Sequence, residues 1–261
     1  MFLDEHEFER VKQALNRIKF PECEDVLIGD ALHYPIQAQI VNVSFMKAIL
    51  KWLWCNFNSI KRLLSCTYIY NNGICSNNSK TLFLFSSSYG NRIDHKKNFE
   101  KLLKLFPESS SATYERKSFR FSVYKLRYIR LLYLWSNLIK TVTKRRVLRA
   151  KILSSLCTVF CDYSDAVHYF GNAAFKSFEN LVTVCNVHAV DSFFTQKFNA
   201  KGKNTVDLMH GAIGDKGHNS WSVKGIKSKN FIADSRHTED MLKRNNYSGK
   251  IWIRSEEYTS E

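Results

Sequence analysis

Histidine and acidic side chains follow two short apolar runs of the sequence, near the point where each run ends. His188 and Asp191 come soon after Leu181–Cys185, and His210 comes directly after Thr205–Met209. Imidazole and carboxylate groups are the usual general bases of enzymes, and both can accept the proton of a reacting hydroxyl. This placement indicates a site for acid–base chemistry, although a histidine at the start of a loop can also serve only as a hydrogen-bonding residue.

A third apolar run, Thr81–Phe85, is followed by a serine-rich loop and then by a helix-length segment from about residue 96 to 105. A loop of small residues before a helix presents free N–H groups that can bind a phosphate or a sugar, although serine-rich strand ends are also common turns. The predicted substrate-binding residues are Ser87, Ser88, Tyr89, Gly90, His210 and Gly211. The candidate catalytic bases are Asp94, His95, His188 and Asp191.

The elements that position these residues form a βαβ pattern. Leu181–Cys185 and Thr205–Met209 are apolar and β-rich, and the segment between them carries apolar residues at helical spacing, from Val190 to Phe198. Gly202 follows that segment where a helix C-cap is expected. Strands joined through a helix are parallel, and ligands of such sheets bind beyond the carboxyl ends of the strands. We therefore expect the loops at 86–91 and 186–191 and the turn at 210–211 to converge on one concave surface.

The sequence predicts an α/β fold, Rossmann-like, with a mainly parallel sheet flanked by helices. The predicted strands are Thr81–Phe85, Leu181–Cys185, Thr205–Met209, Asn230–Ala233 and Lys250–Ile253. Residues 1–80 are predicted as an irregular helical N-terminal portion, with a helix from Asp4 to Ile18 and a strand-like run near Asp25, and residues 81–261 as the Rossmann-like domain.

The charge of the chain indicates an anionic partner. The 261 residues carry a formal net charge of +15, which suits nucleic acid, a membrane surface or a phosphorylated substrate. Between Arg116 and Lys151 there are twelve Lys and Arg and no acidic residue. The predicted membrane- or phosphate-binding residues are the dense cluster Lys144, Arg145, Arg146, Arg149 and Lys151. Nucleic acid is the less favoured partner because the sequence has no zinc finger, RNP motif, KH loop or repeat.

A second basic segment, Phe45–Leu64, has apolar residues at helical spacing together with Trp52 and Trp54. A basic amphipathic helix with tryptophans can lie in a membrane interface. The interpretation favoured by the sequence alone is a helix that covers the sheet and turns its lysines to solvent.

The seven cysteines show no CxxC pair and no zinc-ligand pattern. Cys157 and Cys161 lie near His168, but ordinary buried thiols are expected there, and no metal and no cofactor is predicted. The acidic N-terminus does not match a signal peptide, and no apolar run approaches the ~20 residues that span a bilayer. A cytoplasmic protein is expected, or one held peripherally on the inner face of the membrane.

Four segments carry a resemblance to a known family: IGDALHYPI (28–36), FSSSYGN (85–91), VCNVHAVDS (184–192) and DLMHGAI (207–213). With them the chain resembles the N-terminal half of bacterial cell-surface polysaccharide glycosyltransferases (capsule or lipopolysaccharide) of the GT-B type. The segment FIADSRHTEDMLKRNNYSGKIWI looks like the strand–helix–strand step that leads into the second domain of that family.

The resemblance implies two Rossmann-like domains that face each other across a cleft, the first receiving the acceptor and the second holding the nucleotide-sugar. It implies transfer of a sugar from a nucleotide donor to a lipid-linked or glycan acceptor. This sequence lacks the donor-binding domain, so a fragment, a second chain that supplies that half, or a protein that is no longer catalytic are all expected alternatives. Two other functions stay open: a non-catalytic basic module that binds a membrane or a partner protein, and a nucleic-acid-binding protein.

Overall fold

The computed structural model describes residues 5–17, 24–31, 45–64, 66–71, 79–86, 100–101, 103–106, 109–117, 129–142, 144, 146–154, 156–157, 161, 164, 177–184, 189–208, 223 and 225–253. The chain forms two compact units. The first unit contains residues 1–68, 116–169 and 188–190, and the second contains residues 69–115, 170–187 and 191–261. The units do not follow the predicted division at residue 80, because residues 116–169 group with the N-terminal segment.

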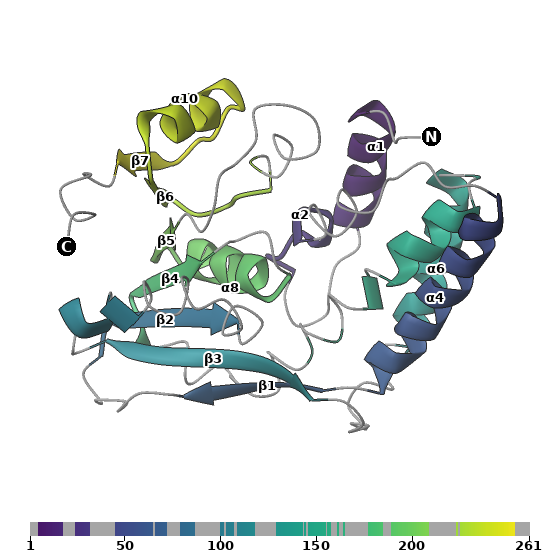
Figure 1. Cartoon of the computed structure of the whole chain (residues 1–261), viewed down its shortest axis with the longest axis horizontal. Coiled ribbons are helices and arrows are strands. Elements are labelled where there is room, and N and C mark those ends of the chain that lie inside the picture. The colour runs from purple at the N-terminus through teal and green to yellow at the C-terminus, as the bar shows by residue number, and fades with distance from the viewer. Residues whose placement is uncertain are drawn as a thin grey trace. The chain divides into compact units, whose positions relative to one another are not determined.

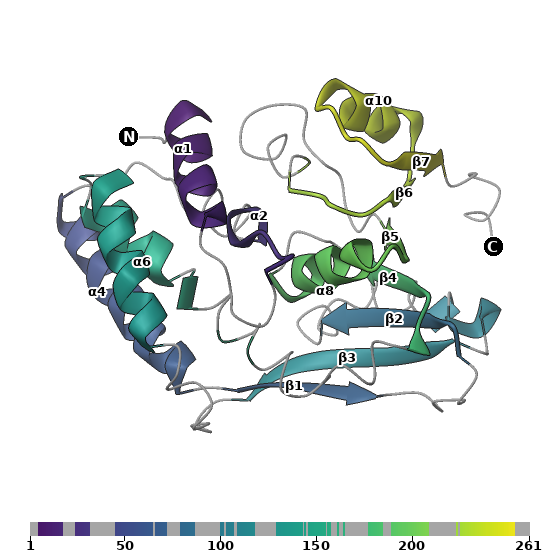
Figure 2. The same cartoon turned by 180° about the vertical axis from the view of Figure 1, so that it is seen from behind.

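A seven-stranded sheet organises the second unit (Figures 1 and 2). Its strands are β1 (Cys66–Asn71), β2 (Thr81–Ser86), β3 (Ser110–Lys117), β4 (Asn180–Val184), β5 (Asn204–Leu208), β6 (Asn230–Ala233) and β7 (Lys250–Ile253). Their order across the sheet is β1-β3-β2-β4-β5-β6-β7. Every pairing from β3 across to β7 is parallel. The predicted α/β fold with a mainly parallel sheet is therefore confirmed, and all five predicted strands are present.

Two strands, β1 and β3, were not predicted. β3 reads SSATYERK and lacks the continuous apolar run that marks a strand buried on both faces. It lies one place from the edge of the sheet, and β1 forms that edge. Peripheral strands leave more of their surface to solvent, so their sequences carry a weaker apolar pattern.

Alternating side chains of the strands form cores on the two faces of the sheet. On one face, β2 and β4 contribute a cluster that includes Phe83, Phe85, Val182 and Val184, with Leu208 of β5. On β6, Phe231 and Ala233 pack with Met241 and Leu242 of α10 (Arg236–Arg244) and with two residues of the preceding loop, Val223 and Ile226.

Helix α8 ends where the sequence predicts, and α10 begins at a side-chain cap. α8 (Ala189–Ala200) connects β4 to β5 and buries Phe193, Phe194 and Phe198. It ends before Gly202, whose φ of 73° is a backbone conformation that glycine adopts at little cost. Ser235 caps α10, and its hydroxyl accepts a hydrogen bond from the Thr238 N–H at 3.3 Å.

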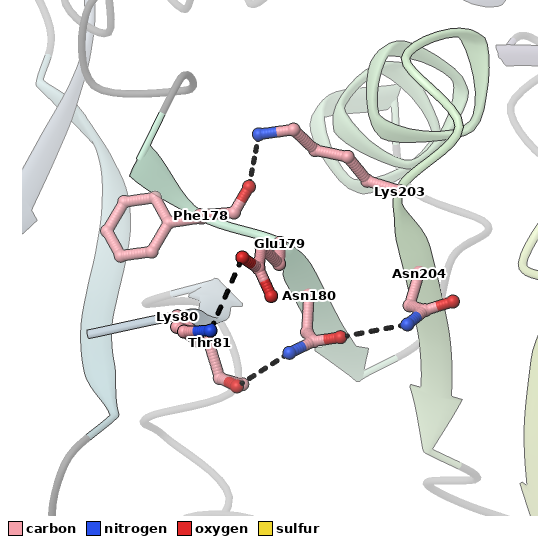
Figure 3. A network of polar contacts seen from close by, with 7 residues as sticks. All are labelled: Lys80, Thr81, Phe178, Glu179, Asn180, Lys203 and Asn204. Carbon is pink, nitrogen blue, oxygen red and sulfur yellow. Dashed lines mark hydrogen bonds and ion pairs between the residues drawn. The ribbon is translucent and has the colours of Figure 1, made fainter. Parts of the chain in front are cut away.

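A polar network holds the amino ends of β2, β4 and β5 in register (Figure 3). Asn180 donates to Thr81 Oγ1 at 3.2 Å, and Asn204 donates to Asn180 Oδ1 at 3.1 Å. Lys80 pairs with Glu179 at 3.5 Å, and Lys203 donates to the carbonyl of Phe178. These bonds join neighbouring strands directly and lie at the edge opposite to the predicted site, so we assign them to stability.

The first unit is built from helices α1 (Glu5–Asn16), α2 (Ile28–Ala31), α4 (Phe45–Leu63) and α6 (Ile129–Val142), with further helical residues at 146–154. α4 and α6 lie side by side (Figures 1 and 2). The prediction of a strand-like run near Asp25 is wrong, because Ile28–Ala31 forms a helical turn that packs on α1. Gly29 permits this packing, since a Cβ at that position would lie 2.2 Å from the carbonyl oxygen of Lys12.

α4 turns its small residues inward and its large apolar residues outward. Cys55 and Ser59 are buried, and Ser59 also hydrogen-bonds Cys157 of the neighbouring helical segment. The exposed apolar residues, which we call the α4 stripe, recur every three or four positions: Met46, Leu50, Leu53, Phe57, Ile60 and Leu64. The α4 stripe therefore lies on the exposed side of α4, and Cys55 and Ser59 lie on its buried side.

Burial should make Cys157 unreactive in the folded protein. Desolvation raises the pKa of its thiol to about 11, against a smaller opposite effect of the Ser59 hydroxyl. At pH 8 about one thiol in a thousand is then the reactive thiolate, compared with roughly a quarter for an ordinary cysteine. Alkylation of Cys157 by iodoacetamide, followed by peptide mass spectrometry, should be at least about a hundredfold slower in buffer than in urea. Equal rates in the two conditions would contradict this burial.

Candidate functional site

The carboxyl ends of β2, β4 and β5 lie at the same edge of the sheet. Leu84 of β2 is opposite Thr183 of β4, and Val184 of β4 is opposite Leu208 of β5. Because these pairings are parallel, the loops that follow Ser86, Val184 and Leu208 all start at this edge, which we call the carboxyl edge. Adjacent strands are only about 5 Å apart, so the three predicted loops begin within about 10 Å of one another.

The strand order changes direction between β2 and β4. From β2 the sheet grows to one side through β3, and from β4 it grows to the other side through β5, β6 and β7. Such a topological switch point separates the two flanking loops and leaves a crevice at the carboxyl ends, which is where open α/β sheets bind ligands. The loops that flank this switch point are the ones that follow β2 and β4. They contain most of the residues predicted from the sequence.

Of the predicted catalytic residues, Asp191 is the one that the structure describes. It lies in the first turn of α8 and is 1% exposed. A carboxylate is stabilised near a helix N-terminus by the helix dipole, so a structural role accounts for its position without any ligand. Nine predicted residues lie outside the described residues: Asp94, His95, His188, Ser87, Ser88, Tyr89, Gly90, His210 and Gly211. Their roles stay predictions.

Asp207 is a buried carboxylate near the carboxyl edge that the sequence analysis did not single out. It is 2% exposed on β5, and its Oδ1 accepts a hydrogen bond from Thr183 Oγ1 at 3.3 Å. An acidic residue inside the apolar run Thr205–Met209 was the available signal, because a buried charge is costly unless it is paired or hydrogen-bonded. Asp207 therefore provides a buried carboxyl group on β5, three positions before His210 in the sequence.

The basic cluster predicted from the sequence is only partly exposed. Lys144 and Arg146 are exposed, Arg149 is half-buried, and Lys151 is 7% exposed. Arg145 lies outside the described residues. Lys151 is therefore not available to a membrane or a phosphate in this structure, whereas Lys144, Arg146 and Arg149 can contact a ligand from solution.

A cavity of about 800 Å³ lies within the first unit, between α4, α6 and the helical residues 146–153. Its walls are mostly apolar and include Ile49 and Trp52 of α4 and Ile139 of α6. Three bases also line it: Lys140, Arg146 and Arg149. The cavity has the size of a small-molecule site, and such sites typically combine apolar walls with a few polar groups.

These three bases, Lys140, Arg146 and Arg149, form no ion pair with any carboxylate that the structure describes. Lys140 Nζ has a neutral partner instead, Asn137 Oδ1 at 3.5 Å. The positive charge of the cavity is therefore available to an anionic ligand.

No protein-family model, no curated protein and no solved structure matches this chain. Among the described residues, no helix is both long enough and apolar enough to cross a membrane, and no group of three metal-ligating side chains occurs.

Proposed function

We propose that this chain is the acceptor-binding half of a glycosyltransferase of bacterial surface polysaccharide synthesis, acting on a lipid-linked or glycan acceptor. The observation that carries the proposal is the switch point between β2 and β4. The loops with the predicted polar residues start on both sides of it, at the edge where parallel sheets bind their ligands. The resemblance of the sequence to GT-B enzymes supplies the choice of reaction.

In this proposal the side chains of the two loops hold the acceptor, and one of the four candidate bases removes the proton from its reacting hydroxyl. The sugar–phosphate bond of the donor then breaks as the acceptor oxygen attacks, and the nucleoside diphosphate leaves with the electron pair. A separate domain or chain binds the donor. The isolated chain should therefore bind acceptor without transferring sugar.

Acceptor binding tests the proposal directly. The chain is screened on a glycan array, and the affinity for the best ligand is measured by calorimetry. His188→Ala and His210→Ala should each weaken binding by about tenfold, since a hydrogen bond to a ligand is lost. His237→Ala is the matched control, because His237 is exposed on α10. This variant should bind the glycan with unchanged affinity.

Three results would contradict this assignment. Absence of any glycan ligand, or equal losses in all three histidine variants, would remove the support for an acceptor site at the carboxyl edge. Transfer of sugar by the isolated chain from a nucleotide-sugar would show that donor binding does not need a second domain.

A second function, a non-catalytic module that binds anionic membranes on the inner face, is favoured by a separate observation. The α4 stripe exposes large apolar side chains, and no acidic residue occurs from Ala31 to Ile93 or from Arg116 to Lys151. Insertion of aliphatic side chains among lipids is favourable because it removes apolar surface from water. The same side chains make few favourable contacts with the charged backbone of a nucleic acid. This function is compatible with the first, because an enzyme that uses a lipid-linked acceptor works at a membrane surface.

A further inference from the structure

We propose that the cavity between α4, α6 and residues 146–153 binds an amphiphile that carries a phosphate group on an apolar chain. The residues that line the cavity belong to the first unit, whereas the carboxyl ends of β2, β4 and β5 belong to the second. The inference holds for a transferase and for a non-catalytic module alike, since it concerns binding alone.

The shape and the lining of the cavity define the apolar part of the ligand. About 800 Å³ is far more than a phosphate ion requires. Ile139, which lines the cavity, is 3% exposed, and Ile49, Trp52, Val147 and Leu153 add further apolar surface. A hydrocarbon chain is the group that fills this space most favourably, because contact between apolar surfaces removes both from water.

The bases of the cavity define the polar part of the ligand. Arg146 and Arg149 are three positions apart on one helical segment, and Lys140 approaches from α6. Residues three apart on a helix lie on the same side, so both guanidinium groups can reach one anion. Guanidinium groups bind phosphate through paired N–H···O bonds. No described carboxylate neutralises these bases, and a phosphate group of the ligand would supply the counter-charge.

Calorimetry with decyl phosphate below its micellar concentration tests this site. Decyl phosphate should bind, whereas decanol and inorganic phosphate should each bind at least tenfold more weakly, because each lacks one half of the required chemistry. The double variant Arg146→Gln/Arg149→Gln should lose about a hundredfold in affinity for decyl phosphate, as two charge-assisted hydrogen bonds are removed. Arg146→Lys/Arg149→Lys should recover part of this loss.

The matched control is Arg10→Gln/Arg17→Gln, which removes the same charge from exposed positions of the first unit that do not line the cavity. It should bind decyl phosphate within about twofold of the unchanged chain. Circular dichroism establishes that all variants are folded. Equal binding of inorganic phosphate, equal losses in the control variant, or unchanged binding by the Gln double variant would each overturn the proposal.

Competition with phosphatidylglycerol vesicles identifies the source of the phosphate. If vesicles displace decyl phosphate, the cavity accepts the phosphodiester of a membrane lipid. If they do not, it selects a terminal phosphate, as on a phosphorylated lipid carrier. Both results support an amphiphile site, and neither depends on whether the histidine variants of the carboxyl edge lose glycan binding.

Discussion

Binding of the chain to anionic vesicles should weaken by about three orders of magnitude when Leu53, Trp54 and Phe57 of α4 are replaced by glutamine. All three side chains are at least half exposed. Insertion of such a side chain contributes at least about 1.5 kcal/mol, so loss of three costs roughly 4.5 kcal/mol, or about a thousandfold. Glutamine is a good helix former, so the helix itself should remain intact. Sedimentation with phosphatidylglycerol vesicles measures the affinity.

The second unit offers a control with the same three residue types. Leu105, Phe106 and Trp252 are also at least half exposed, and their replacement by glutamine should leave vesicle binding unchanged. If both triple variants lose affinity equally, non-specific hydrophobic adsorption explains the binding, and the exposed apolar side chains of α4 have no special role.

The salt dependence separates the apolar and electrostatic contributions. Each base near an anionic surface contributes about 1 kcal/mol, and this contribution is screened by salt. The unchanged chain should therefore bind anionic vesicles less tightly as salt is added, and neutral vesicles only weakly. Equally tight binding to neutral vesicles would exclude the bases as a source of affinity.

The second large effect concerns the ion pair that joins α1 to α2. Asp30 lies 3.1 Å from Lys12, and the two side chains are only 3% and 12% exposed. Asp30→Ala should lower the free energy of unfolding by about 3–5 kcal/mol, because the Lys12 ammonium is left mostly buried without its main counter-charge. Urea unfolding of the purified chain measures the loss.

Two further variants make the origin of this loss clear. Glu9→Ala removes the other carboxylate near Lys12, which is 3.8 Å away and more exposed. It should cost at most about 1 kcal/mol. Lys12→Met together with Asp30→Leu should recover much of the stability, since no buried charge is then left without a partner. If Asp30→Ala and Glu9→Ala have equal small effects, the pair is not the link between the two helices.

Much of the second unit could be predicted from the sequence because its strands are buried on both faces. β2 and β4 are apolar over most of their length, and this local pattern is visible without any partner strand. The same holds for the end of α8 at Gly202 and for the Ser235 cap of α10, which depend on residues within one turn. β1 and β3 were missed because their pairing in the sheet, rather than their own apolar pattern, makes them strands.

The site was predicted in part for the same reason. The apolar runs predicted strand ends at Phe85, Cys185 and Met209, each one residue from the observed ends at Ser86, Val184 and Leu208. Parallel pairing brings these ends to one edge. Asp207 was missed because a single acid in an apolar run does not reveal whether Thr183 of the next strand will meet it. The partner lies 24 residues away along the chain, and only the register of β4 and β5 brings the two together.

The sequence by itself determined the parallel α/β architecture, the strand ends and the positive charge, because each depends on residue types and on spacing within one element. Tertiary structure alone decided the strand order, with its switch point between β2 and β4. It also decided which side of α4 faces the core. The apolar spacing of α4 is equally compatible with a buried and an exposed stripe. Its small residues Cys55 and Ser59 allow close packing on the segment that carries Cys157, and that contact turns the large apolar side chains outward. The cavity bounded by Lys140, Arg146 and Arg149 also exists only because separate helices meet, and no spacing within a single helix could have indicated it.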